Sequence, residues 1–237
     1  MDSKDRIPSL VFSPSLSPVT FRAALIWALD LAPCERRAGP SPWPSELLAR
    51  VRAAGETFIP AERKAAVRAM LRHGVYKPAG RAKPASEYLL AAALEGDGPT
   101  GAFPFVNGPV NANNAVSLAW GYPASVFDLA RTGRELLVRR GLPGESYVFN
   151  PSGQTIDLED LLLVCRRAPS ADGWEPCGNP VKDSMATKVF DGCTEVAAVV
   201  FAPAGDPRAE LEACAARFES LLREDSGAET AGHCIIE

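Results

Sequence analysis

The hydrophobic pattern of the chain changes near residue 121, and this change constrains the fold more than any other feature. Before it, apolar residues recur at helical spacing around 41–56, 60–74, 86–96 and 110–120. After it, short β-rich stretches follow one another between glycines and prolines: SVFDL, ELLVRR, ESYVFN, GQTIDL, LLLVCRR and EVAAVVFAP. Helices followed by closely spaced strands predict an α+β domain, with mixed or antiparallel sheets flanked by helices.

The two ends of the chain are harder to interpret. SLVFS at 9–13 indicates a strand, whereas VTFRAALIWALDL at 19–31 fits either a helix or a short buried strand. Residues 205–224 predict an amphipathic helix, and 225–237 are expected to be a disordered tail. The chain therefore divides into a basic strand and helical part at 1–74, expected to pack on the same domain, a core at 75–204, the helix and the tail.

The composition excludes several classes of protein. No apolar run approaches the roughly 18 residues of a membrane span, and the polar start of the chain is not a secretory signal. We therefore expect a cytoplasmic location and no membrane partner. The 6 cysteines form no C-x-x-C pair and only 2 histidines accompany them, so reduced, buried thiols are expected and a metal site is not.

The charge is unevenly distributed. The whole chain carries a net charge of −4, whereas residues 50–83 hold nine basic and two acidic residues. Such a segment can attract phosphate groups. It can equally be the solvated face of two helices, because lysine and arginine are common at exposed helical positions. Charge alone leaves these two interpretations equally open.

The familiar catalytic motifs are absent: there is no G-x-S-x-G, Walker loop, H-E-x-x-H or G-x-G-x-x-G. His73 ends a basic helix and His233 lies in the tail, so chemistry would depend on positioning and electrostatics. Three polar clusters remain. They comprise the loop and helix start with Tyr76, Lys77, Arg81, Lys83, Ser86 and Glu87, the asparagines of 107–114, and the loop 178–194. Ser86 as a simple helix cap and 178–194 as an ordinary polar surface loop remain alternatives.

Four motifs carry a resemblance to a known family. NNAVSLAWGYPASVFDL and ELLVRRGLPGESYVFN resemble the B3/B4 module of the phenylalanyl-tRNA synthetase β chain. KPASEYLL and KDSMATKV, the latter followed by EVAAVVFAP, resemble free-standing members of that family more closely. The similarity covers roughly 75–204, so the resemblance implies a single B3/B4-like domain.

In that family the module hydrolyses the ester between tRNA and a wrong amino acid. The resemblance thus implies an aminoacyl-tRNA deacylase without a cofactor, whose partner is the acceptor end of a mischarged tRNA rather than DNA. The amino acid could be polar or cationic, such as canavanine. Two alternatives remain open: a module that binds tRNA or an amino acid without chemistry, and an unrelated small-molecule enzyme.

The resemblance also suggests roles for individual residues. Expected catalytic groups are Asn114, Ser125, Thr187 and Lys188, and expected substrate contacts are Asn107, Asn111, Ser117, Asp183 and Ser184. Asp183 would pair with the amine or guanidinium of the substrate. Expected tRNA contacts are Arg68, Arg72, Lys77, Arg81 and Lys83.

Two details sharpen these expectations. Asn111 and Asn114 are three residues apart, so both should point from one helical face into the pocket, with Asn113 facing elsewhere. Ser125 occupies the position at which the family has histidine. Near the position of the family's glutamate, the only acidic residue is Glu195. The pocket therefore differs from the synthetase's.

Overall fold

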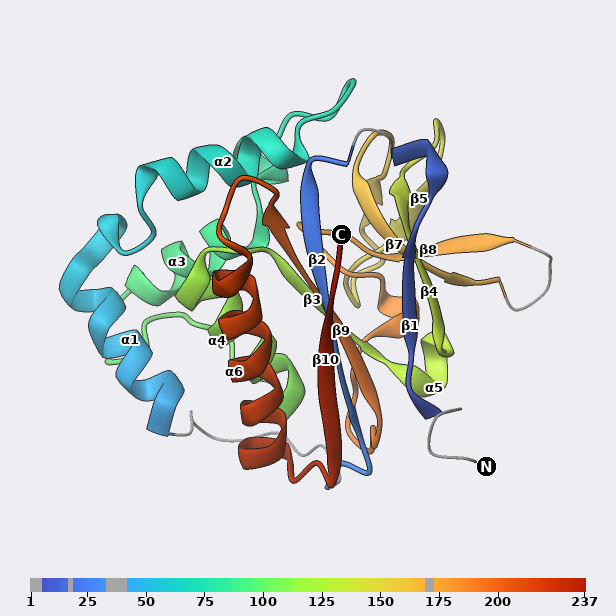
Figure 1. Cartoon of the computed structure of the whole chain (residues 1–237). Helices are drawn as coiled ribbons and strands as arrows, with labels where there is room; N and C mark the ends of the chain where they lie inside the picture. The colour runs from blue at the N-terminus through green and yellow to red at the C-terminus, as the bar shows by residue number, and fades with distance from the viewer. Residues whose placement is uncertain (1–5, 17–18, 33–41, 169–172) are drawn as a thin grey trace.

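The architecture comes from a computed structural model, which describes residues 6–16, 19–32, 42–168 and 173–237. Within them, two four-stranded sheets stack face to face, and helices cover the outer face of one (Figure 1). The protein is therefore an α+β fold with mixed and antiparallel sheets, as the sequence predicts. No helix in the described ranges is long and apolar enough to cross a membrane.

The central sheet has the strand order β10–β2–β9–β3 and is antiparallel at each described pairing. Its strands are β2 (Phe21–Leu29), β3 (Ala124–Asp128), β9 (Val196–Pro203) and β10 (Thr230–Ile236). The outer sheet has the order β1–β4–β7–β8 and is mixed, since β1 runs parallel to β4. It contains β1 (Ser9–Phe12), β4 (Glu135–Arg140), β7 (Leu162–Arg167) and β8 (Trp174–Gly178). A hairpin of β5 (Ser146–Val148) and β6 (Thr155–Asp157) lies beside it.

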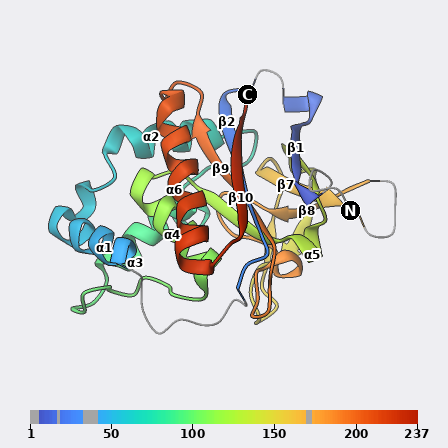
Figure 2. The same ribbon diagram turned by 60° about the horizontal axis from the view of Figure 1, so that its bottom comes forward.

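The helices lie on the side of the central sheet away from the outer sheet (Figures 1 and 2). They are α1 (Pro42–Ala54), α2 (Ala61–Leu71), α3 (Ala85–Leu94), α4 (Gly108–Trp120) and α6 (Arg208–Ser226), while the short α5 (Leu129–Thr132) follows β3. Helices α4 and α6 pack against each other and on the sheet. Residues of α1, α3 and α4 form a second apolar cluster, which includes Leu48, Leu90 and Leu118.

The ambiguous segment 19–31 is a strand because of its place in the layers. Strand β2 pairs with β9 on one side and β10 on the other, and Ala23, Ala24, Leu25 and Ile26 are all buried. A strand with helices on one face and a second sheet on the other buries consecutive residues, which removes the usual alternation of apolar and polar positions. The β propensity of residues 19–31 alone therefore does not predict this strand.

The expectation of a disordered tail is wrong. Residues 230–236 form β10, which pairs with β2 from Thr230 opposite Leu29 to Ile236 opposite Ala23. The pairing needs a glycine at 232, because an added Cβ would lie 2.6 Å from the ring of Trp27. The tail is stabilised by the edge of β2 and by α6, whose Glu219 carboxylate lies 2.6 Å from the His233 ring and whose Arg223 donates to the Ala231 carbonyl.

The N-terminal part does not lie apart from the remainder. Strand β1 pairs with β4 and β2 pairs with β9, so residues before 75 contribute one strand to each sheet. The thiols of Cys165, Cys177 and Cys214 are buried and form no disulfide, as the sequence predicts, whereas Cys234 is exposed, which corrects the expectation for that residue. Cys34 lies outside the described residues.

Removing β10 is expected to destabilise the protein. A chain that ends at Ala228 leaves the edge of β2 unpaired and exposes apolar surface beneath Ile235 and Ile236. The free energy of unfolding should fall by about 2–3 kcal/mol or more, the value of burying part of two such side chains. Urea unfolding measures the change. A chain lacking only Glu237, whose carboxylate pairs with Arg22 at an exposed site, should lose less than about 1 kcal/mol; equal loss in both would contradict a structural role for β10.

Candidate functional site

A cavity of about 350 Å³ opens between α3, α4, the start of β3 and the loop that follows β8. Tyr88 and Leu89 line it from α3, Asn113 and Asn114 from α4, and Ala124 from β3. The loop contributes Asn179, Val181, Lys182, Asp183 and Lys188, and Arg81 stands at the side of α3. Two of the three polar clusters identified in the sequence therefore meet here, together with one cation of the third.

Asp183 is the group in this cavity with the most unusual environment. The side chain is half-buried, and its Oδ1 atom is inaccessible to solvent and has no hydrogen bond of normal length to a described residue. The backbone of Gly178 packs close by, since a Cβ there would lie 2.7 Å from that oxygen. A buried carboxylate oxygen without a partner is costly, so it indicates a place for a donor that the chain does not supply.

The surroundings of Asp183 set its protonation. Burial raises the pKa of its carboxyl to about 7, and this rise is opposed by the Ser125 hydroxyl, by the charge of Lys188 and by nearby backbone amides. The carboxyl thus changes charge near neutral pH. Burial also lowers the pKa of Lys188, whereas the charge of Asp183 raises it.

The loop that carries Asp183 is held by Asn179. The Asn179 Oδ1 accepts the backbone N–H groups of Val181 at 2.8 Å and Lys182 at 2.9 Å. Its Nδ2 donates to the Tyr147 hydroxyl at 2.7 Å, and that hydroxyl donates to the Lys182 carbonyl at 2.6 Å. Asn179 and Tyr147 therefore fix the backbone of Val181 and Lys182, directly before Asp183.

Two lysines are anchored at one residue beside the cavity. The Lys188 ammonium donates to the Phe149 carbonyl at 2.6 Å, and the Lys182 ammonium lies 3.9 Å from the centre of the Phe149 ring. A lysine has three N–H donors, so Lys188 keeps two for other acceptors. The cavity thus combines a carboxylate with one unpaired oxygen, Asp183 Oδ1, and cations that keep donors for an anionic group.

The structure corrects the assignment of the asparagines. Asn113 and Asn114 line the cavity, whereas Asn111 does not, because its Oδ1 accepts the Val106 backbone N–H at 2.8 Å. Asn107 is the N-cap of α4: its Oδ1 accepts from the Val110 N–H, and its Nδ2 donates to the Val189 carbonyl. Asn107 and Asn111 therefore hold the backbone, and only Asn113 and Asn114 face the cavity.

The hydroxyl groups expected at the site are also used by the fold. The Ser117 hydroxyl donates to the Tyr122 carbonyl at 2.6 Å, and Thr187 Oγ1 donates to the Cys177 carbonyl at 3.0 Å. Ser184 caps a short 3-10 turn, and the buried Ser125 hydroxyl lies 3.4 Å from the Asn179 carbonyl oxygen. None of the four lines the cavity; Ser125 reaches it only through Asp183.

The five cations expected to bind tRNA are spread over several surfaces. Arg81 lines the cavity and Lys83 covers the Tyr88 ring at 4.6 Å. Arg68 pairs with Glu87 and does not reach the cavity. Arg72 borders a different cavity, and Lys77 is exposed. Of the five, only Arg81 lines the candidate site, and Lys83 lies beside it on the Tyr88 ring.

Sequence reasoning did not select Asn113, Asn179 or Lys182 as site residues. Asn179 and Lys182 belong to a cluster that the sequence marks, but nothing local distinguishes them from their neighbours. The signal for Asn113 was present in principle: Asn107 precedes a Gly-Pro helix start, so it is a natural cap, and this sets the rotation of the helix.

Comparison of the sequence with known family models and with curated proteins yields no match. Among the described residues, no group of three or more histidine, cysteine, aspartate or glutamate side chains is arranged to hold a metal ion. The chemistry of the cavity must therefore be argued from its own residues.

Asn107 is expected to matter for stability. Asn107→Ala removes the cap of α4 and should lower the free energy of unfolding by about 1–2 kcal/mol. Asn107→Ser keeps a side-chain oxygen that can accept from the Val110 N–H and should recover part of that loss, although it also lacks the Nδ2 donor to the Val189 carbonyl. Thermal or urea unfolding distinguishes the two; equal destabilisation by both variants would contradict the capping role.

Asp183 should make stability depend on pH. Its folded pKa of about 7 lies above the ordinary value of 3.8, so the fold favours the protonated carboxyl. This contribution is complete below about pH 4 and is lost as the pH rises through about 7, an effect on the order of 4 kcal/mol. Asp183→Asn should abolish that pH-dependent loss in urea unfolding measured from pH 4 to 8. Asp191→Asn, at an exposed position, is the control and should keep the pH-dependent loss of stability.

Proposed function

We propose that this protein hydrolyses the ester of a mischarged aminoacyl-tRNA, with the aminoacyl group bound in the Asp183 cavity. The observation that carries this proposal is the buried Oδ1 of Asp183, which has no hydrogen bond to a described residue and borders a cavity lined by amides and lysines. The resemblance of 75–204 to the B3/B4 editing module supports the same activity from an independent direction.

The α-ammonium group of an aminoacyl ester fits the need of Asp183. An ammonium supplies both the missing donor and the opposite charge, and charge-assisted hydrogen bonds are about twice as strong as neutral ones. Since the pKa of Asp183 is about 7, binding of a cation requires loss of that proton. Affinity should therefore rise as the pH increases through this range.

The other polar groups suit the ester and the nucleotide. The Nδ2 groups of Asn113 and Asn114 make only long bonds, at 3.5 Å to the Ala124 carbonyl and 3.4 Å to the Pro104 carbonyl. Amide donors held this loosely can turn to an ester oxygen as negative charge develops on it. Lys182, Lys188 and Arg81 stand nearby for the phosphate and ribose of the tRNA end.

One observation favours the alternative of a binding module. None of the described residues that line the cavity is a histidine, and Ser125 is buried with its hydroxyl toward a backbone carbonyl. Catalysis would then depend on a water molecule positioned by the amides and the substrate rather than on a side-chain base. Binding of aminoacyl-tRNA without hydrolysis is the outcome expected if this water is not activated.

The direct test measures loss of the ester from a panel of mischarged tRNAs. At least one pair should be hydrolysed faster than in buffer alone. Asp183→Asn should reduce kcat/KM for that substrate about 10- to 100-fold, the value of one charge-assisted hydrogen bond. Asp191→Asn, in an exposed loop, should leave it unchanged.

The outcomes separate the candidate functions. Salt-dependent tRNA binding that is weakened by Asp183→Asn, with no ester loss for any pair, identifies a binding module. If the protein neither binds nor hydrolyses any tRNA of the panel, both the deacylase and the tRNA-binding module are ruled out. If a folded Asp183→Asn variant hydrolyses the ester at an unchanged rate, Asp183 has no role in substrate binding, although the protein is still a deacylase.

A further inference from the structure

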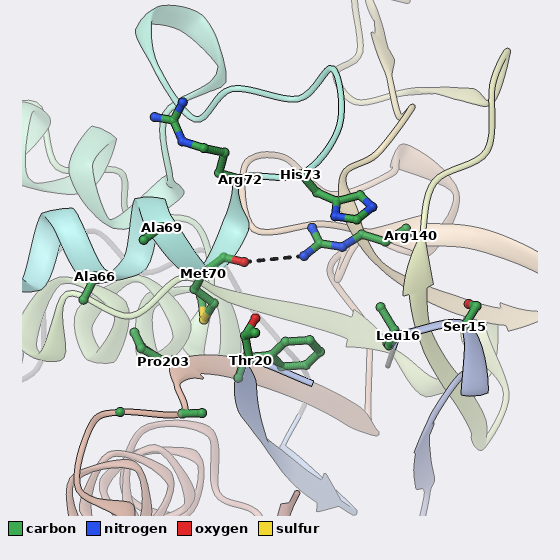
Figure 3. A pocket seen from close by; sticks show the side chains of 13 residues that line it. Ser15, Leu16, Thr20, Ala66, Ala69, Met70, Arg72, His73, Arg140 and Pro203 are labelled. Carbon is green, nitrogen blue, oxygen red and sulfur yellow. Dashed lines mark hydrogen bonds between the residues drawn. The ribbon is translucent and has the colours of Figure 1, made fainter. Parts of the chain in front are cut away.

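A second and larger cavity, of about 600 Å³, lies where β2 begins and β9 ends (Figure 3). Helix α2 forms one wall and Arg140, the last residue of β4, another. It shares no lining residue with the Asp183 cavity. Of the residues selected from the sequence, only Arg72 borders it, so the proposed hydrolysis leaves this cavity unexplained.

Arg140 is the group that gives this cavity its character. Its Nη1 donates to the carbonyls of Leu71 at 3.1 Å and Asp160 at 3.3 Å, and its Nη2 donates to the Met70 carbonyl at 3.5 Å (Figure 3). All three acceptors are backbone oxygens, and no described carboxylate forms an ion pair with this guanidinium. Burial lowers the pKa of Arg140, an effect opposed by the charge of Asp160 nearby.

Capping the end of α2 accounts for only part of this arrangement. A cation near the last carbonyls of a helix is a common stabilising feature. However, a guanidinium has five N–H donors, and the three bonds to carbonyls leave two of them without an acceptor among the described residues. These two donors can pair with an anion through charge-assisted hydrogen bonds.

The rest of the cavity is apolar with a few polar groups at its rim. Leu16, Phe21, Met70 and Pro203 contribute apolar surface, while Ser15 and Thr20 add hydroxyls. His73 and Arg140 both line the cavity, and Figure 3 shows the Arg72 side chain extending away from the Arg140 guanidinium. The volume falls in the range of ligand pockets, which combine apolar walls with a few placed polar groups.

We propose that this cavity binds a small organic anion, whose carboxylate or phosphate group pairs with Arg140 while its apolar body packs on Phe21 and Met70. An inorganic anion would leave the apolar walls unfilled. A neutral apolar molecule would leave the two spare guanidinium donors unpaired. The two-part ligand alone satisfies both surfaces.

The test titrates the intact protein with four probes, followed by heteronuclear NMR and calorimetry. Phenylacetate and phenyl phosphate carry the two candidate anionic groups, benzyl alcohol lacks the charge, and inorganic phosphate lacks the apolar body. At least one aromatic anion should bind saturably with Kd near or below about 1 mM, and benzyl alcohol and inorganic phosphate at least about tenfold more weakly. Which aromatic anion binds better distinguishes carboxylate from phosphate recognition.

Two variants locate the binding. Ala69→Leu fills part of the cavity from α2 without touching Arg140 and should weaken binding at least about tenfold. Ala65→Leu, on the same helix, borders a different hollow and should have no effect. Arg140→Gln should abolish the preference for anions over benzyl alcohol, but it also loosens the end of α2, so Ala69→Leu is the decisive variant.

Absence of saturable binding for both aromatic anions would overturn the proposal, as would binding that Ala69→Leu leaves unchanged. None of the probes is an aminoacyl ester, and none of these substitutions lies in the Asp183 cavity. Failure here therefore does not affect the proposed hydrolysis, and failure of the hydrolysis test does not affect this cavity.

Discussion

The pairing of β2 with β9 is the interaction on which the rest of the structure depends. Both strands are buried along most of their length, with helices on one side and the outer sheet on the other. Their pairing extends from Phe21 opposite Pro203 to Ala28 opposite Val196. Because β9 also pairs with β3, it aligns β3 beside the loop that follows β8, and this alignment creates the wall of the Asp183 cavity.

Conflicting demands on polar groups shape the candidate site. Most of its amides and hydroxyls are engaged by the backbone: Asn107 and Asn111 hold the start of α4, and Asn179 holds the loop of Asp183. The groups left over, Asp183 above all, are those that a ligand can satisfy. A site built this way needs rigid support. A buried oxygen without a partner persists only where the surrounding structure prevents the side chain from turning toward solvent or another donor.

The basic segment at 50–83 shows how charge in sequence differs from charge in space. Arg63 pairs with Asp206 and Glu210, Arg68 pairs with Glu87, and Lys64 lies near Glu56. Arg52 donates to the carbonyls at the end of α3. Ion pairs within and outside the segment thus engage several of its cations, and of the remainder Arg81 lines the Asp183 cavity, Arg72 borders the second cavity and Lys77 is exposed.

The sequence by itself determined the main helices, the strands between residues 121 and 167 and the buried strand β9, because these depend on periodicity and on caps read within a few residues. It also located the polar loop 178–194 and the asparagine stretch as the material of a site. Only the tertiary structure decided that 21–29 and 230–236 are strands, since each is stabilised by an edge distant in sequence. It likewise decided that Asn113 rather than Asn111 faces the cavity, because the rotation of α4 follows from its cap and its packing on the sheet and on α6.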